Sequence, residues 1–226
     1  MIITVAHQKG GVGKSTISVN LAVVMGADMF DLDKQFSSAE FNACRVADGR
    51  PGLLVFTLLE AKCKAKFQTP IPQENMIDVL MKYRRNPKKH IIVDCPGLDH
   101  DNIRNVILMA DYILTPVATS QVEVWGLQNF EDILKTVELT KGEKIISHIL
   151  INRADSRAAS RLSELRDFIQ SDNYVFCKSH ISQAVAFQDS FSLGKAVTES
   201  VAKKWQKSKN EMQDLVCEIK KDLKIK

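Results

Sequence analysis

A short glycine-rich stretch near the amino terminus carries residue types that bind phosphate. It reads HQKGGVGKST over residues 7–16. Glycines let backbone N–H groups approach a crowded anion, while a lysine and a hydroxyl supply a cation and a magnesium ligand. The residues expected around the phosphates are Gly10, Gly11, Val12, Gly13, Lys14, Ser15 and Thr16. The stretch therefore predicts a nucleoside triphosphate site with Mg²⁺, with Lys14 at the β- and γ-phosphates and Ser15 on the metal.

The stretch departs from the common loop pattern GxxxxGK[ST] at two positions. Gln8 stands where the first glycine is expected, and a second lysine, Lys9, precedes Lys14 by five positions. A lysine at this place is either a solvated neighbour of the loop or a further cation for phosphate. Its spacing by itself leaves both interpretations open.

The elements around the loop follow from the apolar pattern. Residues 2–6 form an apolar run that predicts a buried strand, and residues 14–25 have apolar side chains at helical spacing. Further apolar runs predict interior strands over residues 27–31, 90–94, 112–116 and 145–151. Helical spacing predicts helices over residues 74–85, 102–109, 122–138, 156–170 and 197–223. Such alternation is typical of an α/β fold, a mainly parallel twisted sheet with helices on both faces.

Composition indicates a single domain over residues 1–226. The chain is 45% hydrophobic, which is ample for one core, and its net charge of +4 is compatible with nucleic acid or acidic lipid. Its five cysteines form no CxxC pair, so free thiols in a reducing cytoplasm are expected. No signal peptide is evident, and the longest apolar run is far shorter than the roughly 20 residues of a membrane span.

Several segments together resemble one protein family. KGGVGKST resembles the deviant Walker A motif of the ParA/MinD group of P-loop ATPases. DCPGLD at 94–99 resembles the switch II stretch of that family, and ILINR at 149–153 resembles its base-binding strand end. FQDSFSLGKAVTE at 187–199 resembles the segment before its terminal helix. The resemblance covers residues 1 to about 199, weakly across 36–89, and implies a P-loop ATPase that uses ATP and Mg²⁺.

The resemblance assigns catalytic roles to three residues. Lys9 matches the signature lysine, which in the family reaches the phosphates bound by the partner subunit. Lys14 matches the lysine that serves its own nucleotide. Asp33, in FDLDKQ, matches the switch I aspartate that positions the attacking water, although Lys34 stands where the family commonly has proline.

The resemblance also assigns the metal and base contacts. Asp94 matches the Walker B carboxylate, which holds Mg²⁺ through water together with Ser15, and Asp31 is placed in the magnesium shell. Asn152 matches the asparagine that approaches adenine. Asp31 and Asp33 could instead be turn or helix-cap residues, and the sequence leaves that alternative open.

Within the family, the chain resembles the small ParA-type partition ATPases that lack an amino-terminal DNA-binding domain. This implies an ATP-dependent homodimer that binds DNA without sequence preference in the cytoplasm, associates with the nucleoid, and is released after hydrolysis stimulated by a centromere-binding, ParB-like partner. Plasmid partition and chromosome segregation are the expected processes. The lysines expected to contact DNA, near the predicted terminal helix, are Lys195, Lys203, Lys204 and Lys207. An alternative basic patch consists of Arg84, Arg85, Lys88 and Lys89, and sequence does not choose between them.

Two other functions remain open. The first is a MinD-like spatial regulator that cycles on a membrane, although the tail EIKKDLKIK has few large apolar residues and no stable membrane association is expected. The second is a nucleotide-dependent metabolic enzyme of the same fold, such as a ligase. Polar residues in 36–50 could contribute to its substrate pocket, but no acid–base constellation stands out there.

Overall fold

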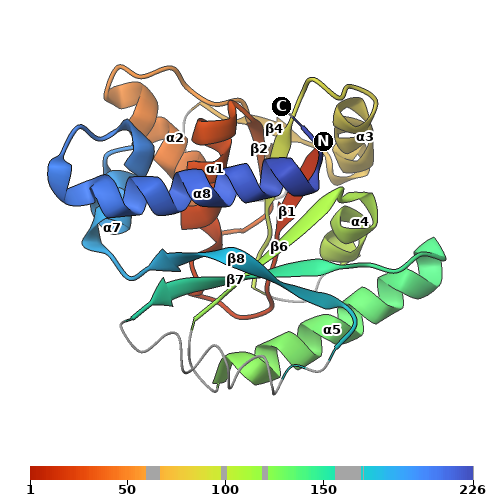
Figure 1. Cartoon of the computed structure of the whole chain (residues 1–226). Coiled ribbons are helices and arrows are strands. Elements are labelled where there is room, and N and C mark those ends of the chain that lie inside the picture. Colours follow the sequence, from red (N-terminus) through yellow and green to blue (C-terminus); the bar gives the residue numbers. More distant parts are fainter. Residues whose placement is uncertain (60–66, 98–100, 119–121, 156–168, 170, 226) are drawn as a thin grey trace.

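A single parallel sheet organises the molecule (Figure 1). The computed structural model describes residues 1–59, 67–97, 101–118, 122–155, 169 and 171–225. Eight strands lie in the order β4-β3-β2-β5-β1-β6-β7-β8, and every neighbouring pair is parallel. The predicted α/β fold with a parallel sheet is therefore confirmed.

The strands predicted from apolar runs all lie in the interior of the sheet. The strands are β1 (Ile2–Val5), β2 (Asp28–Asp31), β3 (Val55–Leu58), β4 (Thr69–Ile71), β5 (Ile91–Asp94), β6 (Tyr112–Val117), β7 (Ser147–Ala154) and β8 (Tyr174–Ser182). Every residue of β1, β5 and β6 is buried, because helices cover both faces, so these strands appear in the sequence as continuous apolar runs. The pattern missed β3, β4 and β8, which lie at or next to the edges of the sheet and are only partly buried.

Helices connect the strands and cover the sheet. They are α1 (Lys14–Met25), α2 (Ser37–Ala47), α3 (Met76–Arg84), α4 (Asp101–Met109), α5 (Val122–Lys141), α7 (Val185–Ser192) and α8 (Gln206–Asp222). Short 3₁₀ turns occur at Gln73–Asn75, Val197–Glu199 and Lys203–Trp205. The predicted bounds of α1 agree with the structure, whereas the helix predicted over 156–170 lies almost entirely outside the described residues. In the described part of the chain, no helix is long and apolar enough to cross a membrane.

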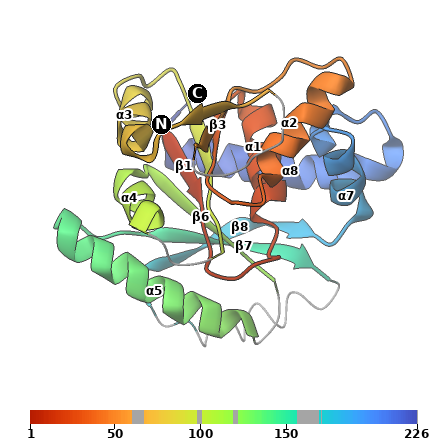
Figure 2. The same cartoon turned by 180° about the vertical axis from the view of Figure 1, so that it is seen from behind.

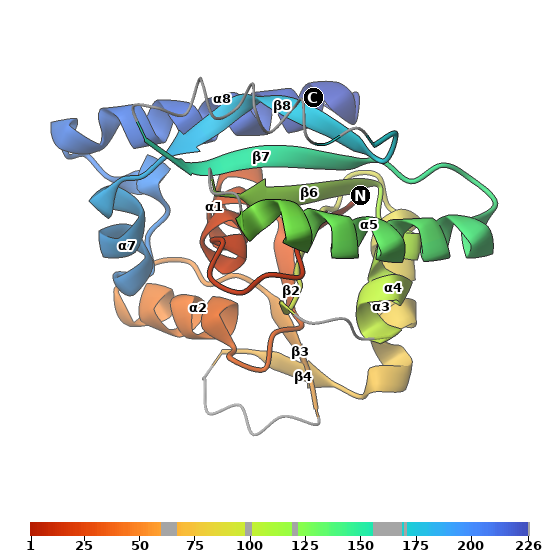
Figure 3. The same ribbon diagram turned by 90° about the horizontal axis from the view of Figure 1, so that it is seen from below.

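Helices α3, α4 and α5 cover one face of the sheet, and α1, α2, α7 and α8 cover the other (Figures 2 and 3). The side chains of each group of helices form one apolar core with the sheet. Neighbouring strand residues contribute to opposite cores, as Ile92 and Val93 do on β5. This alternation follows from the two-residue period of a strand. Helices therefore pack against both faces of each interior strand, and this packing fixes the position of its carboxyl end.

The helix predicted over 197–223 is wrong in its first part, because α8 begins at Gln206. The helical spacing that predicted this part rests on apolar residues four positions apart, Val197, Val201 and Trp205, but Val201 is 99% exposed. Tertiary contacts hold this part of the chain instead: the backbone N–H of Val197 donates to Asn20 on α1, and Trp205 packs into the core. Lys203 and Lys204 consequently lie before the terminal helix, in a short 3₁₀ turn.

Candidate nucleotide-binding site

The glycine-rich stretch forms the connection between β1 and α1 at the carboxyl edge of the sheet. Gly11 and Gly13 have φ angles of 77° and 95°, a left-handed conformation that other residues adopt only with strain. The loop that follows β5 starts at the same edge of the sheet and lies against the glycine-rich loop. A Cβ atom on Gly97 would be 3.1 Å from the backbone nitrogen of Gly10. Two turns of backbone therefore meet at the place where the sequence predicts the phosphates.

Lys14 is directed back into its own loop. Its ammonium nitrogen donates to the backbone carbonyl of Lys9 at 2.8 Å, and only 6% of the surface of Lys14 is exposed. Burial lowers the pKa of Lys14, and the charge of Asp94 partly opposes that effect. A phosphate would offer this ammonium a charged acceptor in place of a neutral carbonyl, and such hydrogen bonds are roughly twice as strong.

Asp94 is surrounded by hydroxyl groups. Ser18 donates to its Oδ1 at 3.2 Å and Ser38 donates to its Oδ2 at 2.8 Å, while Ser15 is a further hydrogen-bond partner. Burial raises the pKa of Asp94 to about 6, although the hydrogen bonds from Ser15 and Ser38 lower it. Asp31 lies opposite Asp94 on the neighbouring strand, and both residues have no exposed surface.

These residues fit a magnesium ion. Carboxylate and hydroxyl oxygens are the hard ligands that Mg²⁺ prefers, and Ser15 and Asp94 bring one of each together. The carboxyl groups of Asp31 and Asp94 both have a raised pKa, chiefly because of burial, and the charge of Asp94 adds to the shift of Asp31. A divalent cation would relieve the cost of burying two carboxylates side by side.

Asp31 also holds the start of α2. Its Oδ2 accepts the backbone N–H groups of Ser38 and Ala39 at 3.0 and 3.1 Å. Its Oδ1 accepts the N–H of Asp33 at 3.1 Å. The interpretation of Asp31 as a turn and cap residue therefore describes its contacts, and its place in a magnesium shell stays a prediction.

Asp33 lies two residues beyond the end of β2, in a tight turn. Its Oδ1 accepts the N–H of Gln35 at 3.0 Å, and its carbonyl accepts the N–H of Phe36 at 2.9 Å. Asp33 is close enough to Asp94 for its charge to add to burial in raising the pKa of that carboxyl. A half-buried carboxylate beside the predicted phosphate and metal groups is suited to orient a water molecule.

Asn152 lies against the phosphate loop. Its Nδ2 donates to the carbonyl of Val12 at 2.7 Å, and a Cβ atom on Gly13 would overlap its amide. Next to it is a cavity of about 140 Å³. The cavity is lined by Gly13, Thr16, Ile17, Asn152, Arg153, Ser182, Gln183, Ala184, Phe187 and Gln188.

Sequence reasoning missed most of this cavity wall. Ser182 ends β8 and residues 183–188 follow it. Because the apolar pattern did not predict this strand, the sequence did not indicate that these residues lie at the carboxyl edge. The available signal was the resemblance of the segment that begins at Phe187. The cavity places Asn152 beside a space that could receive a base, and its role as the adenine contact stays a prediction.

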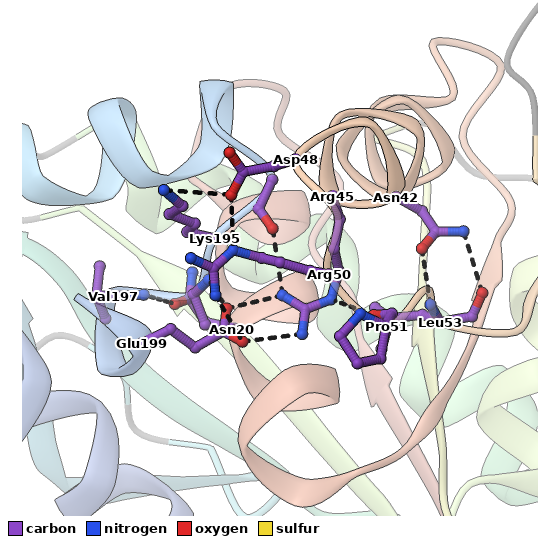
Figure 4. Close-up of polar contacts among 12 residues, drawn as sticks. Asn20, Asn42, Arg45, Asp48, Arg50, Pro51, Leu53, Lys195, Val197 and Glu199 are labelled. Atoms are coloured by element: carbon purple, nitrogen blue, oxygen red, sulfur yellow. Dashed lines mark hydrogen bonds and ion pairs between the residues drawn. The ribbon is translucent and has the colours of Figure 1, made fainter.

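The lysines predicted to bind DNA differ in their surroundings. Lys203, Lys204 and Lys207 are exposed. Lys195 is half-buried and forms an ion pair with Asp48 at 3.2 Å, within a polar cluster between α2 and the segment before α8 (Figure 4). Lys207 is 3.7 Å from Glu211 but its side chain remains 74% exposed.

Lys207 lies at the same edge as the cavity, and Lys203 and Lys204 shortly precede it in the chain. Glu211, on α8, accepts hydrogen bonds from both the N–H and the hydroxyl of Ser182, which lines the cavity. Glu211 is also the ion-pair partner of Lys207. The first turns of α8 are therefore fixed to the carboxyl end of β8.

The alternative basic patch lies at the opposite edge. Its members Arg84, Arg85, Lys88 and Lys89 are exposed between the end of α3 and the start of β5. The amino group of Met1, just before β1, donates to the carbonyl of Lys89 at 2.7 Å. Because β1 and β5 are parallel, this patch is at the amino edge of the sheet, away from the phosphate loop.

Comparisons with known proteins identify a family and a shared fold. The family model described as "ATPase MipZ" matches residues 1–187. The chain is 24% identical over 164 residues to "Maintenance of carboxysome distribution protein A" of Halothiobacillus neapolitanus, covering 70% of this chain and 68% of that protein. It is 22% identical over 232 residues to "Sporulation initiation inhibitor protein Soj" of Bacillus subtilis, covering 87% and 89%. The fold matches that of a Cyanothece McdA variant in complex with ATP, with a TM-score of 0.63 at 16% identity, covering 100% of this chain and 96% of that one.

Proposed function

This chain belongs to the ATPase MipZ family, within the ParA/MinD group of deviant Walker A ATPases, and on that premise we propose that it is a DNA-partition ATPase. ATP closes two copies into a homodimer, the dimer binds DNA without sequence preference, and hydrolysis stimulated by a ParB-like partner releases it. The cycle takes place on the nucleoid in the cytoplasm. The observation that carries the proposal is that exposed Lys207 pairs with Glu211, which accepts hydrogen bonds from Ser182 in the wall of the nucleotide cavity, and that exposed Lys203 and Lys204 shortly precede it in the chain.

The nucleotide chemistry is assigned to the residues of the carboxyl edge. Lys14 leaves the carbonyl of Lys9 and binds the phosphates of its own subunit. Ser15 and Asp94 hold Mg²⁺, with Asp31 behind them, and the bound ion supplies positive charge beside the phosphate oxygens. Asp33 orients the attacking water, which is the main protein contribution to phosphoryl transfer besides charge stabilisation.

Lys9 is assigned to the partner's nucleotide. Two triphosphates brought face to face repel each other, and a lysine from each subunit placed near the other's phosphates offsets that repulsion. An ammonium there also stabilises the charge that develops in the transition state. Dimerisation and hydrolysis are thereby linked, as is required of an ATPase whose closed dimer lasts until its nucleotide is hydrolysed.

DNA contact is assigned to Lys203, Lys204 and Lys207. Lys207 lies at the edge where the nucleotide binds and the other two shortly precede it in the chain, so a change in that edge on dimer closure can bring two sets of lysines into one surface. Lys195, predicted as a fourth contact, is engaged by Asp48 and would have to exchange that carboxylate for a phosphate. The contribution of Lys195 to DNA binding should therefore be the smallest of the four.

The test compares two triple variants with equal loss of charge. The first changes Lys203, Lys204 and Lys207 to alanine, and the control changes Arg84, Arg85 and Lys88 at the opposite edge. With ATP, wild type and control should bind non-specific DNA with a steep salt dependence, and the first variant should lose affinity and much of the salt slope. An unchanged salt slope in the first variant, or loss in the control instead, would contradict the assignment. Binding to acidic liposomes rather than DNA would favour a membrane-cycling regulator.

A further inference from the structure

His7 is buried beneath the phosphate loop and is bonded to it. The residue is 1% exposed, and its Nδ1 lies 2.8 Å from the backbone nitrogen of Lys9. Because Nδ1 accepts the N–H of Lys9, the proton of the neutral ring is on Nε2. Burial, followed by the charges of Lys14 and Lys9, lowers the pKa of His7 to about 4, so the ring is neutral at pH 7 and can act as an acceptor.

Gly126, on α5, lies against the Cε1 edge of the ring, next to the Nδ1 atom that accepts the N–H of Lys9. A Cβ atom on Gly126 would lie 2.8 Å from Cε1 and 3.5 Å from Nε2 of His7. The backbone of α5 thus touches the edge of the imidazole, at a place where no side chain fits without displacement. The ring therefore contacts this helix and the amide of Lys9 through neighbouring ring atoms, and a rotation of the ring would change both contacts.

The backbone of Lys9 is therefore pinned at both of its peptide groups. His7 holds the N–H, and the ammonium of Lys14 holds the carbonyl at 2.8 Å. If Lys14 moves to a bound phosphate, the carbonyl loses that contact. Of these two restraints, the bond from His7 is the one that does not depend on the nucleotide.

We propose that His7 is a positioning residue, which fixes the backbone of Lys9 so that the Lys9 side chain reaches the nucleotide of the partner subunit. The inference rests on the proposed function, because that function gives Lys9 its role across the dimer. A lysine has four side-chain torsions, so it delivers its charge efficiently to a distant phosphate only from a fixed starting point. Gly126 supports His7, and through it α5 contributes to the geometry of the loop.

The first experiment uses two substitutions of nearly equal shape. Asparagine carries an acceptor oxygen at the branch position that Nδ1 occupies in histidine, whereas leucine has the same branching without an acceptor. We expect His7→Leu to lower ATP hydrolysis by about tenfold, the effect of losing one buried hydrogen bond, and His7→Asn to recover most of it. ATP binding by monomers should remain within about twofold of wild type in both. Equal hydrolysis by the two variants would overturn the proposal.

The second experiment asks in which subunit His7 acts. A His7→Leu subunit is combined with an Asp33→Ala subunit in heterodimers purified through two different affinity tags. The site of the His7→Leu subunit keeps Asp33 and receives a correctly held Lys9 from its partner. We therefore expect recovery towards half of wild-type hydrolysis. No recovery would show that the substitution damages the site of its own subunit, and it would overturn the proposal.

A parallel heterodimer of Lys9→Ala and Asp33→Ala subunits tests the trans role of Lys9 separately from the role of His7. If the Lys9→Ala heterodimer recovers ATP hydrolysis and the His7→Leu heterodimer does not, the role of His7 is wrong and the proposed function stands. If the Lys9→Ala heterodimer does not recover hydrolysis, the trans role of Lys9 is wrong, and the inference on His7 is wrong with it. If His7→Leu does not fold, Gly126→Ala takes its place in the heterodimer, because it displaces the ring while keeping every polar group. Recovery towards half of wild-type hydrolysis is again expected, and no recovery would overturn the proposal.

Discussion

Asp31 and Asp94 lie directly opposite each other, at the ends of the adjacent parallel strands β2 and β5, and neither has any exposed surface. The pairing brings two acidic residues that are 63 positions apart in the sequence to one point of the sheet edge. Ser38, at the start of α2, contacts both carboxylates, through its backbone N–H and its hydroxyl. The predicted metal site and the first turn of α2 are therefore one structural unit.

Removal of one charge from this pair should stabilise the protein and stop catalysis. Asp94→Asn should raise the free energy of unfolding at pH 7 by about 1–2 kcal/mol without nucleotide, because it removes a buried charge whose hydroxyl neighbours can also serve an amide. Magnesium-dependent ATP hydrolysis should be lost. Urea unfolding and phosphate release measure the two effects. Asp33→Asn is the control: it should slow hydrolysis but change stability by less than about 0.5 kcal/mol. A destabilised Asp94→Asn would contradict this account of the pair.

The two lysines of the loop should differ in their effect on monomers. Lys14→Ala should weaken ATP binding by about a hundredfold, because losing one partner of a close charge pair costs about 3 kcal/mol. Lys9→Ala should leave ATP binding by monomers nearly unchanged while ATP-dependent dimerisation and hydrolysis fail. Titration with a fluorescent ATP analogue below the dimerisation concentration, followed by light scattering, measures both. Equal loss of monomer binding in the two variants would exclude a purely trans role for Lys9.

The buried His7 should make the protein sensitive to acid. Its pKa in the folded state, about 4, lies below the ordinary value of 6.5. Between these values the unfolded chain takes up a proton that the folded protein excludes, so this contribution to stability is complete above pH 6.5 and falls as the pH is lowered towards 4. The loss should be about 2 kcal/mol between pH 6.5 and pH 5. Urea unfolding at several pH values should show that loss in wild type and a correspondingly smaller one in His7→Asn; parallel curves for the two proteins would refute it.

The ion pair between Arg45 and Glu199 should be required for stability. Arg45, at the end of α2, donates to both carboxylate oxygens of Glu199 at 2.7 and 2.9 Å and is almost fully buried (Figure 4). Glu199→Gln should cost about 3 kcal/mol of unfolding free energy, because it leaves the guanidinium buried without a counter-charge. The more exposed Arg50 offers a control, and Arg50→Gln should cost less than about 1 kcal/mol. Comparable losses in the two variants, measured by urea unfolding, would mean that burial does not decide the effect.

Several parts of the fold and the site could be predicted because they depend on neighbouring residues. A strand, a glycine turn and a helix in direct succession place Gly13, Lys14 and Ser15 at a helix start whatever the rest of the chain does. The interior strands β1, β5 and β6 could be located because burial on both faces demands continuous apolar runs. The regular spacing of α1 likewise comes from its own residues.

Other parts were decided by contacts between distant segments. The pattern Val197, Val201 and Trp205 indicates a helix, but the bond from Val197 to Asn20 and the pair of Glu199 with Arg45 hold that segment in another conformation. These partners are more than 150 positions away in the sequence, and periodicity carries no information about them.

The arrangement of charges around the site was decided in the same way. Composition identifies two basic clusters. The bonds of Glu211 place Lys207 at the nucleotide edge, and strand direction places the cluster that includes Arg84 at the other edge. Asp31 and Asp94 are both acidic residues at strand ends, and the register of the sheet makes them neighbours. Only Asp31 also accepts backbone N–H groups from the start of α2. Local sequence thus determined which groups can bind a nucleotide, and the packing of a parallel sheet determined which of them meet, because only tertiary contacts can join groups that the chain keeps far apart.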